Sequence, residues 1–541
     1  MIGVVAEEPE LAAVAEFFEL FKSPWEFYQP GKHYDVLLSS TNWIPETDAT
    51  LVVSYGSHEN ASGEPQSIRT AHGPKLIRVC GERIPIYGNY LLRDTNADEL
   101  LFHQTKQSLA PWPKGGGQQT VVRIGFDLFQ EVQYLLTVGQ RPEFAVTPTL
   151  ELHITILRNL IISNQVSFVE ILPIPAGHHF IVCLTHDIDH PRVRYHMFDH
   201  TMFGFLYRAV VGSTIQLCRG RRSLRQLAVN WKAAVSLPFV FAGLVNDFWD
   251  QISEYLKLEK ELASTFCVIP VRGEAGFDVH GRLKTKRAAS YDLTDVADDL
   301  QKLQSANREV GVHGIDAWCD VAKGRIERER VEKITGPRQL GTRMHWLYFD
   351  VQTPVALEEA GFDYDSTVGY NETIGYRAGT TQVFKPLNAN RLLELPLHIM
   401  DTALFYSGYM NLSDDQANAA MRPLIENANR FGGVLTTNWH DRSLGPERLW
   451  SQPYCDLLAE LKDNKPWFAT ASDAVSWFRK RRAAKISEVT NETEVFRAEL
   501  SLGENGDTLP GLIARVYTPG RRNNPFVDVS VNSRTTIEVP V

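Results

Sequence analysis

The stretch Ile181-Val182-Cys183-Leu184-Thr185-His186-Asp187-Ile188-Asp189-His190-Pro191 contains the features from which the fold can be inferred. Its first four residues are apolar, which is typical of a buried strand, and Pro191 stops a strand. Two carboxylates and two imidazoles lie between positions 186 and 190. Because parallel α/β sheets and barrels carry their chemistry at the carboxyl ends of strands, this stretch predicts such a strand end.

Alternating helix and strand signals extend outward from this stretch, from about residue 176 to 480. Amphipathic helical patterns are expected at 246–262, 292–303, 416–430 and 447–461, and each leads into an apolar, strand-like run. Those runs lie at 264–269, 309–313, 433–437 and 467–470. Repeated helix–strand units of this kind predict an α/β fold with a parallel sheet or barrel.

Polar side chains follow several of these predicted strands. Besides those at 186–190 they are His313, Asp316, Arg343, His345, His440 and Asp441. Carboxylates and neutral imidazoles are ligands that suit zinc and, with weaker affinity, cobalt, manganese or iron. A bound ion with an open position lowers the pKa of a water, and a nearby carboxylate and histidine can move the protons. The pattern therefore predicts a metal-dependent hydrolytic site at the strand ends.

Composition excludes several other classes. The chain has 541 residues, of which 43% are hydrophobic and 22% charged, as in ordinary globular proteins. A net charge of -10 argues against sequence-independent binding of nucleic acid. The six cysteines form no C-x-x-C pair, so no disulfide framework or zinc knuckle is indicated. Residues 1–10 contain acids and no apolar leader, which predicts a cytoplasmic location.

The regions on either side of the alternating pattern differ from it. Residues 1–175 combine strand-like runs such as 36–39 and 50–54 with helical patterns near 126–136 and 150–162, which predicts an α+β accessory domain. After residue 485 short alternating strands predict a small β appendage. The expected domains are therefore 1–175, 176–484 and 485–541.

Residues 192–245 interrupt the alternating pattern and are expected to form a helical insertion. The segment is rich in arginine and in aromatic and aliphatic runs. Its apolar runs, 203–217 and 233–245, are at least roughly five residues shorter than the ~20 that a bilayer requires. The segment is interpreted either as a lid or surface for an anionic polymer or membrane face, or as a solvated helical decoration.

Four ordered motifs resemble those of polysaccharide deacetylases with NodB homology, of the carbohydrate esterase type. They are Thr185-His186-Asp187-Ile188-Asp189-His190, Gly311-Val312-His313-Gly314, Arg343-Met344-His345-Trp346 and Val434-Leu435 leading to His440. The Thr-His-Asp-x-Asp-His form, with further motifs at 361–367 and 375–380, is similar to a bacterial subgroup linked to surface-polysaccharide gene clusters. The resemblance implies a distorted (β/α) barrel that removes N-acetyl groups from a carbohydrate.

The resemblance also implies roles for individual residues. Asp187 matches the catalytic base and Arg343 the arginine that pairs with it. Asp189 and His313 match ligands of one divalent metal ion, for which zinc is expected and cobalt, manganese or iron are alternatives. His440 matches the general acid.

Two further residues are expected to contact the carbohydrate. Arg377 lies in the motif at 375–380, and Trp439 precedes His440. An indole can stack on a sugar ring, but it can equally belong to the core.

The chain departs from the family pattern at Ala317, where a second metal histidine is expected. Catalytic zinc sites normally use three protein ligands, so another residue must complete the set. His345 is the preferred candidate, because the wider family has proline at that position. Asp316 is the main alternative, and His186 and His190 are weaker ones, since His186 should point away from Asp187 along a strand.

Three functions are compatible with these observations. The first is a metal-dependent carbohydrate N-deacetylase. The second is a metal hydrolase of a non-sugar amide, because fold does not determine substrate. The third is a non-catalytic carbohydrate-binding or assembly protein.

Overall fold

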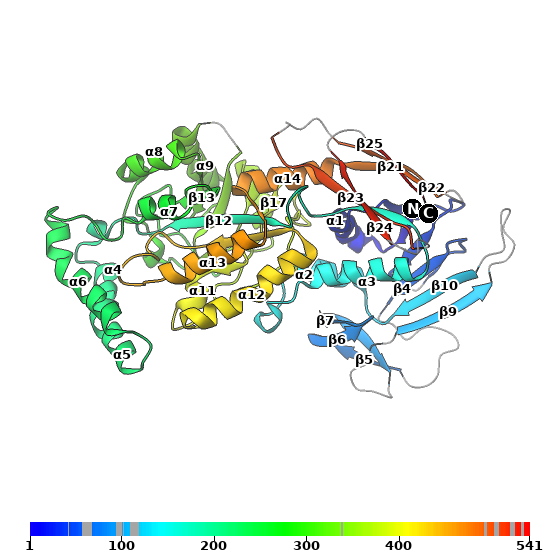
Figure 1. Cartoon of the computed structure of the whole chain (residues 1–541), viewed down its shortest axis with the longest axis horizontal. Helices are drawn as coiled ribbons and strands as arrows, with labels where there is room; N and C mark the ends of the chain where they lie inside the picture. The colour runs from blue at the N-terminus through cyan, green and yellow to red at the C-terminus, as the bar shows by residue number, and fades with distance from the viewer. Residues whose placement is uncertain are drawn as a thin grey trace. The chain divides into compact units, whose positions relative to one another are not determined.

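The computed structural model describes residues 1–41, 43–56, 68–93, 100, 102–108, 118–336, 339–491, 495–502, 508–519, 525–531 and 535–540 (Figure 1). The chain divides into two compact units. Unit 1 comprises residues 1–177, 376–387 and 476–541, and unit 2 comprises 178–375 and 388–475. These units are defined by the contacts within each of them. The division into domains 1–175, 176–484 and 485–541 is inferred from sequence patterns, and it stays a prediction.

Unit 2 is organised around one parallel sheet. In spatial order its strands are β17 (Leu393–Glu394), β16 (Tyr364–Asp365), β15 (Gly341–Met344), β14 (Glu309–Gly314), β13 (Ser264–Val268), β12 (Ile181–Ile188), β19 (Val434–Asn438) and β18 (Ile399–Met400), and β20 (Trp467–Phe468) also pairs with β12. Every pairing is parallel, and the sheet curls into a half-barrel. The predicted α/β class is confirmed, and the specific NodB-type barrel stays a prediction.

Strand β12 lies inside this sheet, with β13 on one side and β19 on the other, because it can be buried along its whole length. All eight of its residues are buried, including the polar ones at its carboxyl end. Thr185 pairs with Thr265 on one side and with Asn438 on the other. On β14 and β15, His313 pairs with Arg343. Since all these strands are parallel, their carboxyl ends meet at one edge of the sheet.

The helices of unit 2 follow the predicted alternation. They are α7 (Ile252–Leu258), α8 (Ala297–Ser305), α9 (Val321–Thr335), α10 (Thr353–Ala360), α11 (Asp401–Phe405), α12 (Asp414–Phe431) and α13 (Ser451–Asp463), with 3-10 turns η5 (Thr285–Arg287), η6 (Leu293–Val296) and η7 (His345–Leu347). The helix expected at 246–262 is shorter than predicted. The Asp247 carboxylate accepts a hydrogen bond from the Trp249 backbone N–H at 3.0 Å, and such a local turn competes with a helix.

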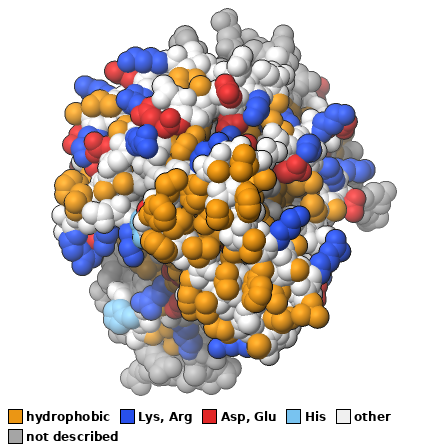
Figure 2. All heavy atoms as spheres, turned by 90° about the vertical axis from the view of Figure 1, so that its left-hand side faces the viewer, with side chains coloured by type: hydrophobic (Ala, Val, Ile, Leu, Met, Phe, Trp, Pro, Cys, Tyr) orange, Lys and Arg blue, Asp and Glu red, His pale blue; other side chains and the backbone are white. Residues whose placement is uncertain are grey.

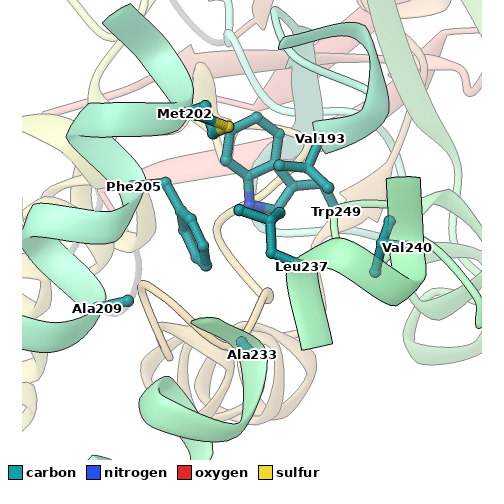
Figure 3. Packing of buried hydrophobic residues seen from close by; sticks show 8 residues of the cluster. All are labelled: Val193, Met202, Phe205, Ala209, Ala233, Leu237, Val240 and Trp249. Carbon is teal, nitrogen blue, oxygen red and sulfur yellow. The ribbon is translucent and has the colours of Figure 1, made fainter. Parts of the chain in front are cut away.

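Residues 192–245, which are expected to form a helical insertion, are helical over most of their length. The segment contains the 3-10 turn η3 (Val193–His196), α4 (His200–Leu206), the π-helix η4 (Tyr207–Gly212), α5 (Ser213–Cys218) and α6 (Leu224–Phe241). Ser223 begins α6 with a capping box to Gln226, which satisfies backbone donors at the helix start. The inward sides of α4 and α6 share a buried cluster that includes Phe205, Leu237 and Trp249 (Figure 3).

Glu447 ties the insertion to the rest of unit 2. One of its carboxylate oxygens accepts a hydrogen bond from Arg208 Nε at 2.9 Å, and the other accepts one from Trp249 Nε1 at 3.1 Å. A buried carboxylate is stable only with such charge-assisted partners. Within the described part of the chain, no helix combines the length and the apolar character needed to cross a bilayer.

Unit 1 is built on a second sheet, of six strands. In spatial order these are β2 (Trp25–Phe27), β1 (Ile2–Val5), β3 (Val36–Ser39), β4 (Leu51–Tyr55), β10 (Gln118–Ile124) and β9 (Phe102–Ser108), all parallel except for the pair of β9 and β10. Its helical elements are η1 (Glu8–Glu10), α1 (Leu11–Phe21), α2 (Leu128–Thr137), η2 (Pro142–Phe144), α3 (Thr149–Ser163) and the later part of α14 (Ala471–Ala483).

Short antiparallel strands complete unit 1. Two pairs are formed by β5 (Ile68–His72) with β8 (Asn89–Arg93) and by β6 (Lys75–Val79) with β7 (Glu82–Ile86). One three-stranded sheet contains β11 (Phe168–Ile171), β23 (Leu512–Tyr517) and β24 (Phe526–Val531). The other contains β21 (Lys485–Asn491), β22 (Val495–Ser501) and β25 (Thr535–Pro540). From residue 485 on, the described chain contains the strands β21 to β25, and their grouping into a separate appendage stays a prediction.

Candidate metal centre

Side chains from three parallel strands meet at the carboxyl edge of the unit 2 sheet. Asp187 lies near the end of β12 and Asp189 follows that strand directly. His313 lies near the end of β14, and His345 begins the turn after β15. Residues that are distant in sequence become neighbours here because the parallel strands of one sheet end at the same edge.

Asp189, His313 and His345 form a group whose ligand atoms all lie within 4.8 Å of one another. His345 Nδ1 is 3.0 Å from His313 Nε2 and 3.2 Å from Asp189 Oδ1, and His313 Nε2 is 3.3 Å from the same oxygen. Metal–nitrogen and metal–oxygen bonds of a tetrahedral zinc ion would separate its ligand atoms by about 3.3 Å. The three side chains therefore have the spacing that a divalent ion requires.

A second observation also fits a cation at this place. Asp189 Oδ1 is buried, and apart from the imidazole nitrogens of His345 and His313 at 3.2 and 3.3 Å it has no hydrogen-bond partner among the residues that the structure describes. A buried carboxylate oxygen without a donor is costly unless a positive charge compensates it. The donor set, one carboxylate and two imidazoles, is one that zinc and related ions bind.

The two histidines are oriented for coordination. His313 Nδ1 lies 2.9 Å from the Arg343 carbonyl oxygen, so a proton on Nδ1 would leave the Nε2 lone pair facing Asp189. Burial lowers the pKa of His345, which favours the neutral imidazole that a metal binds. The backbone after His345 is left-handed, with φ of 66° at Trp346 and 53° at Leu347, and such strain is frequent at functional sites.

The Asp187 carboxylate is held on both of its oxygens. Arg343 donates to Oδ1 at 3.1 Å, and Asn438 Nδ2 donates to Oδ2 at 2.7 Å. Burial alone would raise the pKa of Asp187, but nearby positive charge, from His313 when it is protonated and from Arg343 and His440, keeps this pKa below its ordinary value. Asp187 is therefore an ionised and fixed carboxylate beside the three candidate metal ligands.

Arg343 is itself immobilised by its neighbours. Its Nε donates to the Ser366 carbonyl at 3.0 Å, and its terminal nitrogens donate to Thr185 Oγ1 at 2.7 Å and to Ser366 Oγ at 2.9 Å. The guanidinium is fully buried. A buried arginine with this many fixed acceptors can orient a carboxylate in one geometry.

His440 forms a pair with Asp401. The distance from His440 Nδ1 to Asp401 Oδ1 is 2.6 Å, and the His440 backbone N–H donates to Asp401 Oδ2 at 2.8 Å. Burial alone would lower the pKa of His440, but Asp401, with contributions from Asp189 and Asp187, raises it to about 10. The other ring nitrogen, Nε2, lies 3.9 Å from Asp189 Oδ2. An imidazole that holds a proton thus faces the candidate metal ligands.

The other candidates for the third ligand point elsewhere. Asp316 forms an ion pair with Lys323 at 2.5 Å and accepts a hydrogen bond from the Phe277 backbone at 3.0 Å. His186 points away from Asp187, as expected, because its ring nitrogens contact the Trp439 carbonyl and the Glu259 carboxylate. The ring of His190 contacts His196.

A cavity of about 580 Å³ opens over this group of residues. Asp187, Asp189 and His440 line it, and the insertion contributes His200, Thr201 and Arg208. The aromatic lining residues are Trp346, Tyr348, Tyr406 and Tyr409. The cationic ones besides Arg208 are Lys286, Arg442 and Arg448.

Two of the lining arginines have no carboxylate partner within 4.0 Å among the described residues. Arg442 is 9% exposed, its guanidinium lies 4.9 Å from the centre of the Trp249 ring, and its Nη1 has no hydrogen-bond partner in the described chain. Arg448 Nη1 donates to Ser443 Oγ at 3.2 Å, and Arg448 Nη2 donates to the Tyr406 hydroxyl. The cavity wall is therefore cationic beyond the metal-binding group.

The two residues expected to contact carbohydrate lie in different environments. Trp439 is fully buried, donates from Nε1 to the Trp450 carbonyl at 3.3 Å and packs on Tyr454, so its indole belongs to the core and does not line the cavity. Trp346, which is 39% exposed, does line it. Arg377 belongs to unit 1, where its carbonyl oxygen accepts a hydrogen bond from Gln140, and its contact with substrate stays a prediction.

Comparisons with known proteins do not assign this chain to a family. No family model and no curated protein matches the sequence. A crystal structure of a Mycobacterium smegmatis protein, provisionally described as a polysaccharide deacetylase, is similar with a TM-score of 0.34 and 16% sequence identity. The match covers 59% of this chain and 98% of that one. A similarity this loose carries no argument about activity, which rests on the site itself.

Three residues of the site were not predicted from the sequence. Asp401, Asn438 and Ser366 hold His440, Asp187 and Arg343 through the contacts given above. Asn438 ends β19, only two residues before His440, and its position at a strand end was a signal that could have found it. Asp401 follows a strand of only two residues, which no pattern in the sequence reveals.

Proposed function

We propose that this protein is a metal-dependent hydrolase that removes N-acetyl groups from a carbohydrate, on a barrel of the NodB deacetylase type. The observation that carries the proposal is the convergence of Asp189, His313 and His345 beside two proton-transfer groups. One of these is the ionised Asp187 and the other is the protonated His440. Amide hydrolysis needs this combination, because water must lose a proton and the departing amine must gain one.

Asp189, His313 and His345 would hold the ion, for which zinc is the first candidate. When bound, such an ion polarises a carbonyl and lowers the pKa of a water toward neutrality. Asp187 would act as the general base and accept the proton of that water. Arg343 acts as a positioning residue, since it holds the Asp187 carboxylate ionised and in one orientation.

His440 would act as the general acid. Asp401 accepts a hydrogen bond from the protonated Nδ1 and leaves Nε2 facing the cavity, so the second proton of the imidazolium would point toward an amide bound there. The raised pKa keeps that proton in place until negative charge develops on the leaving nitrogen. Because Asp187 and His440 carry different charges in the resting site, they can serve as base and acid without exchanging roles.

The cavity wall favours a sugar that carries an acidic group. Trp346 and Tyr348 offer aromatic faces on which sugar rings can stack. Arg442 and Arg448 offer guanidinium groups without carboxylate partners, and such groups bind carboxylate or phosphate through paired hydrogen bonds. We therefore expect N-acetylated saccharides with a carboxylate or phosphate to bind better than neutral ones.

The test combines metal analysis with acetate release. The purified full chain would be loaded with zinc or cobalt and assayed on chitooligosaccharides, peptidoglycan fragments and N-acetylglucosamine 1-phosphate. Wild type should bind about one ion and release acetate, and Asp189→Ala should lose both. Asp316→Ala serves as the matched control, because that carboxylate lies outside the metal-binding group.

The other outcomes discriminate the remaining functions. A protein that binds the ion and releases no acetate from any of these sugars would be a hydrolase of another amide. A protein that binds neither zinc nor cobalt would be a non-catalytic binding protein, and the proposal would be wrong.

A further inference from the structure

Exposed hydrophobic side chains are concentrated on the helical insertion. Residues 192–245 are 54 residues long, a tenth of the chain, yet they hold 14 of the 29 exposed large hydrophobic side chains in the described part of the protein. Single exposed apolar residues are ordinary, whereas a contiguous group of them marks a surface that contacts something. Figure 2 shows hydrophobic side chains gathered on one face, with Lys and Arg side chains along its edges.

Helix α6 is apolar on two opposite sides. Its inward side packs Ala233, Leu237 and Val240 into the buried cluster (Figure 3). Its outward side carries Leu224, Trp231, Val235 and Phe239, which are 73%, 47%, 71% and 51% exposed. Spacings of seven, four and four residues place these four side chains on one stripe of the helix. The inward side accounts for the fold of the insertion, and the outward stripe is left without a partner in the described chain.

A second stripe runs along α4, η4 and α5. Phe203, Tyr207, Val211 and Ile215 follow one another at intervals of four residues, and all four are exposed. A soluble helix would carry polar side chains on such a side. The two stripes together form the apolar face of the insertion.

The insertion is also strongly basic in an acidic protein. Residues 192–245 contain eight Lys and Arg and a single Asp, a net charge of +7, in a chain whose total is -10. Several of these cations are paired, as Arg208 is with Glu447. Four of the cations are exposed, and within the described part of the chain no carboxylate lies within 4.0 Å of them: Arg219, Arg221, Arg225 and Lys232. These four flank the outward stripe of α6 and the turn before it.

We propose that the insertion binds the surface of a lipid bilayer that contains anionic lipids. An exposed apolar stripe bordered by Lys and Arg is the pattern of a helix that lies in the membrane interface, with its apolar side chains among the acyl chains and its cations at the headgroups. An anionic polysaccharide would satisfy the cations and leave the stripes in water. A second copy of the chain would bring two faces of charge +7 together, which opposes association.

The insertion connects this face with the metal-binding cavity. His200 and Thr201 of α4 line the cavity. Phe203, two residues later in the same helix, belongs to the exposed stripe along α4, η4 and α5. Docking through the stripes would therefore hold the cavity beside the lipid surface. Membrane binding itself does not depend on catalysis and can be tested without substrate.

The test is flotation of the full chain with vesicles of phosphatidylcholine alone and of phosphatidylcholine mixed with phosphatidylglycerol. The apolar variant carries Leu224→Ser, Val235→Ser and Phe239→Ser, and the charge variant carries Arg219→Gln, Arg221→Gln and Arg225→Gln. The matched control carries Val279→Ser, Leu283→Ser and Val351→Ser, three exposed apolar side chains of unit 2 outside the insertion. Circular dichroism and thermal unfolding would establish that each variant is folded.

Wild type and control should float with the anionic vesicles and bind phosphatidylcholine more weakly. The apolar and charge variants should each show a partition coefficient about tenfold or more below that of wild type. The reason is that each apolar side chain buried in the membrane and each contact of a cation with an anionic headgroup contributes separately to the free energy of membrane binding. Absence of wild-type binding to the anionic vesicles would overturn the proposal, as would equal binding by all four proteins. A wild-type dimer that the apolar variant dissociates, or binding to alginate in place of vesicles, would overturn it in favour of a second copy or an acidic polymer.

Discussion

His345 Nδ1 lies 3.0 Å from His313 Nε2, and both nitrogens lie within 3.3 Å of the same Asp189 oxygen. Two imidazole nitrogens at this distance cannot both carry a proton, because the hydrogens would clash. Either one nitrogen donates a hydrogen bond to the other, or, as proposed here, both offer a lone pair to a shared cation.

His345→Ala should therefore release the metal. Two remaining protein ligands hold a zinc-like ion poorly. Loss of a residue that only hydrogen-bonds to a ligand lowers metal affinity by up to about 100-fold, so loss of a ligand itself should lower it by more. Competition with a chelator would measure the affinity. Asp316→Ala should keep the wild-type affinity, and the opposite pattern would assign the third ligand to Asp316.

Asp187→Asn should keep the metal and lose turnover. The amide can still accept a hydrogen bond from Arg343, but it cannot accept a proton from water, and a general base contributes roughly 10²- to 10⁴-fold. Acetate release and metal content, measured on the same sample, separate the two roles. If the variant lost the metal, Asp187 would be a ligand and the division of roles between the two carboxylates would be incorrect.

His440→Ala should lower kcat with little change in KM or in metal content, because a general acid acts on the leaving group in the transition state. Asp401→Asn should reduce kcat to a smaller extent, since the imidazole remains but loses the carboxylate that raises its pKa. Wild-type kinetics in His440→Ala would remove this residue from the mechanism.

Arg442→Gln should weaken binding of acidic sugars in particular. A hydrogen bond to a charged group is worth about 1.5–3 kcal/mol, so KM for N-acetylglucosamine 1-phosphate should rise by about tenfold or more. KM for a neutral chitooligosaccharide should change little. An equal change for both substrates would indicate that Arg442 supports the fold of the cavity.

Glu151 in unit 1 should make stability depend on pH. Burial raises its pKa to about 7, against hydrogen bonds from Thr380 and Thr381 that favour the charged form. Between the ordinary glutamate pKa of 4.5 and about 7 the folded state binds more protons than the unfolded state, so stability falls as the pH rises through this range.

Glu151→Gln removes this titration and should make the protein more stable than wild type at pH 8, by on the order of 3 kcal/mol at most, with no gain at pH 5. Urea unfolding at the two pH values would measure the difference. A variant that is less stable at pH 8 would show that the charged carboxylate is the stabilising form.

The sequence by itself determined the class of fold and the chemistry of the strand ends. A run of apolar residues that leads into Asp187 and Asp189 fits a buried strand with polar residues at its carboxyl end, and the strand β12 has this form. The helix–strand alternation of residues 176–480 and the helical nature of 192–245 are also local properties. Periodicity and composition record such properties directly.

The tertiary structure alone decided which side chains meet. His345 rather than Asp316 faces Asp189, because the turn after β15 directs the imidazole inward while Lys323 holds Asp316 away. Asp401 supports His440 from a neighbouring strand end, and Trp439 is buried in the core although it precedes a site residue. These outcomes depend on strand register and on the direction of single side chains, which arise from contacts between residues far apart in the chain and leave no periodic trace in the sequence.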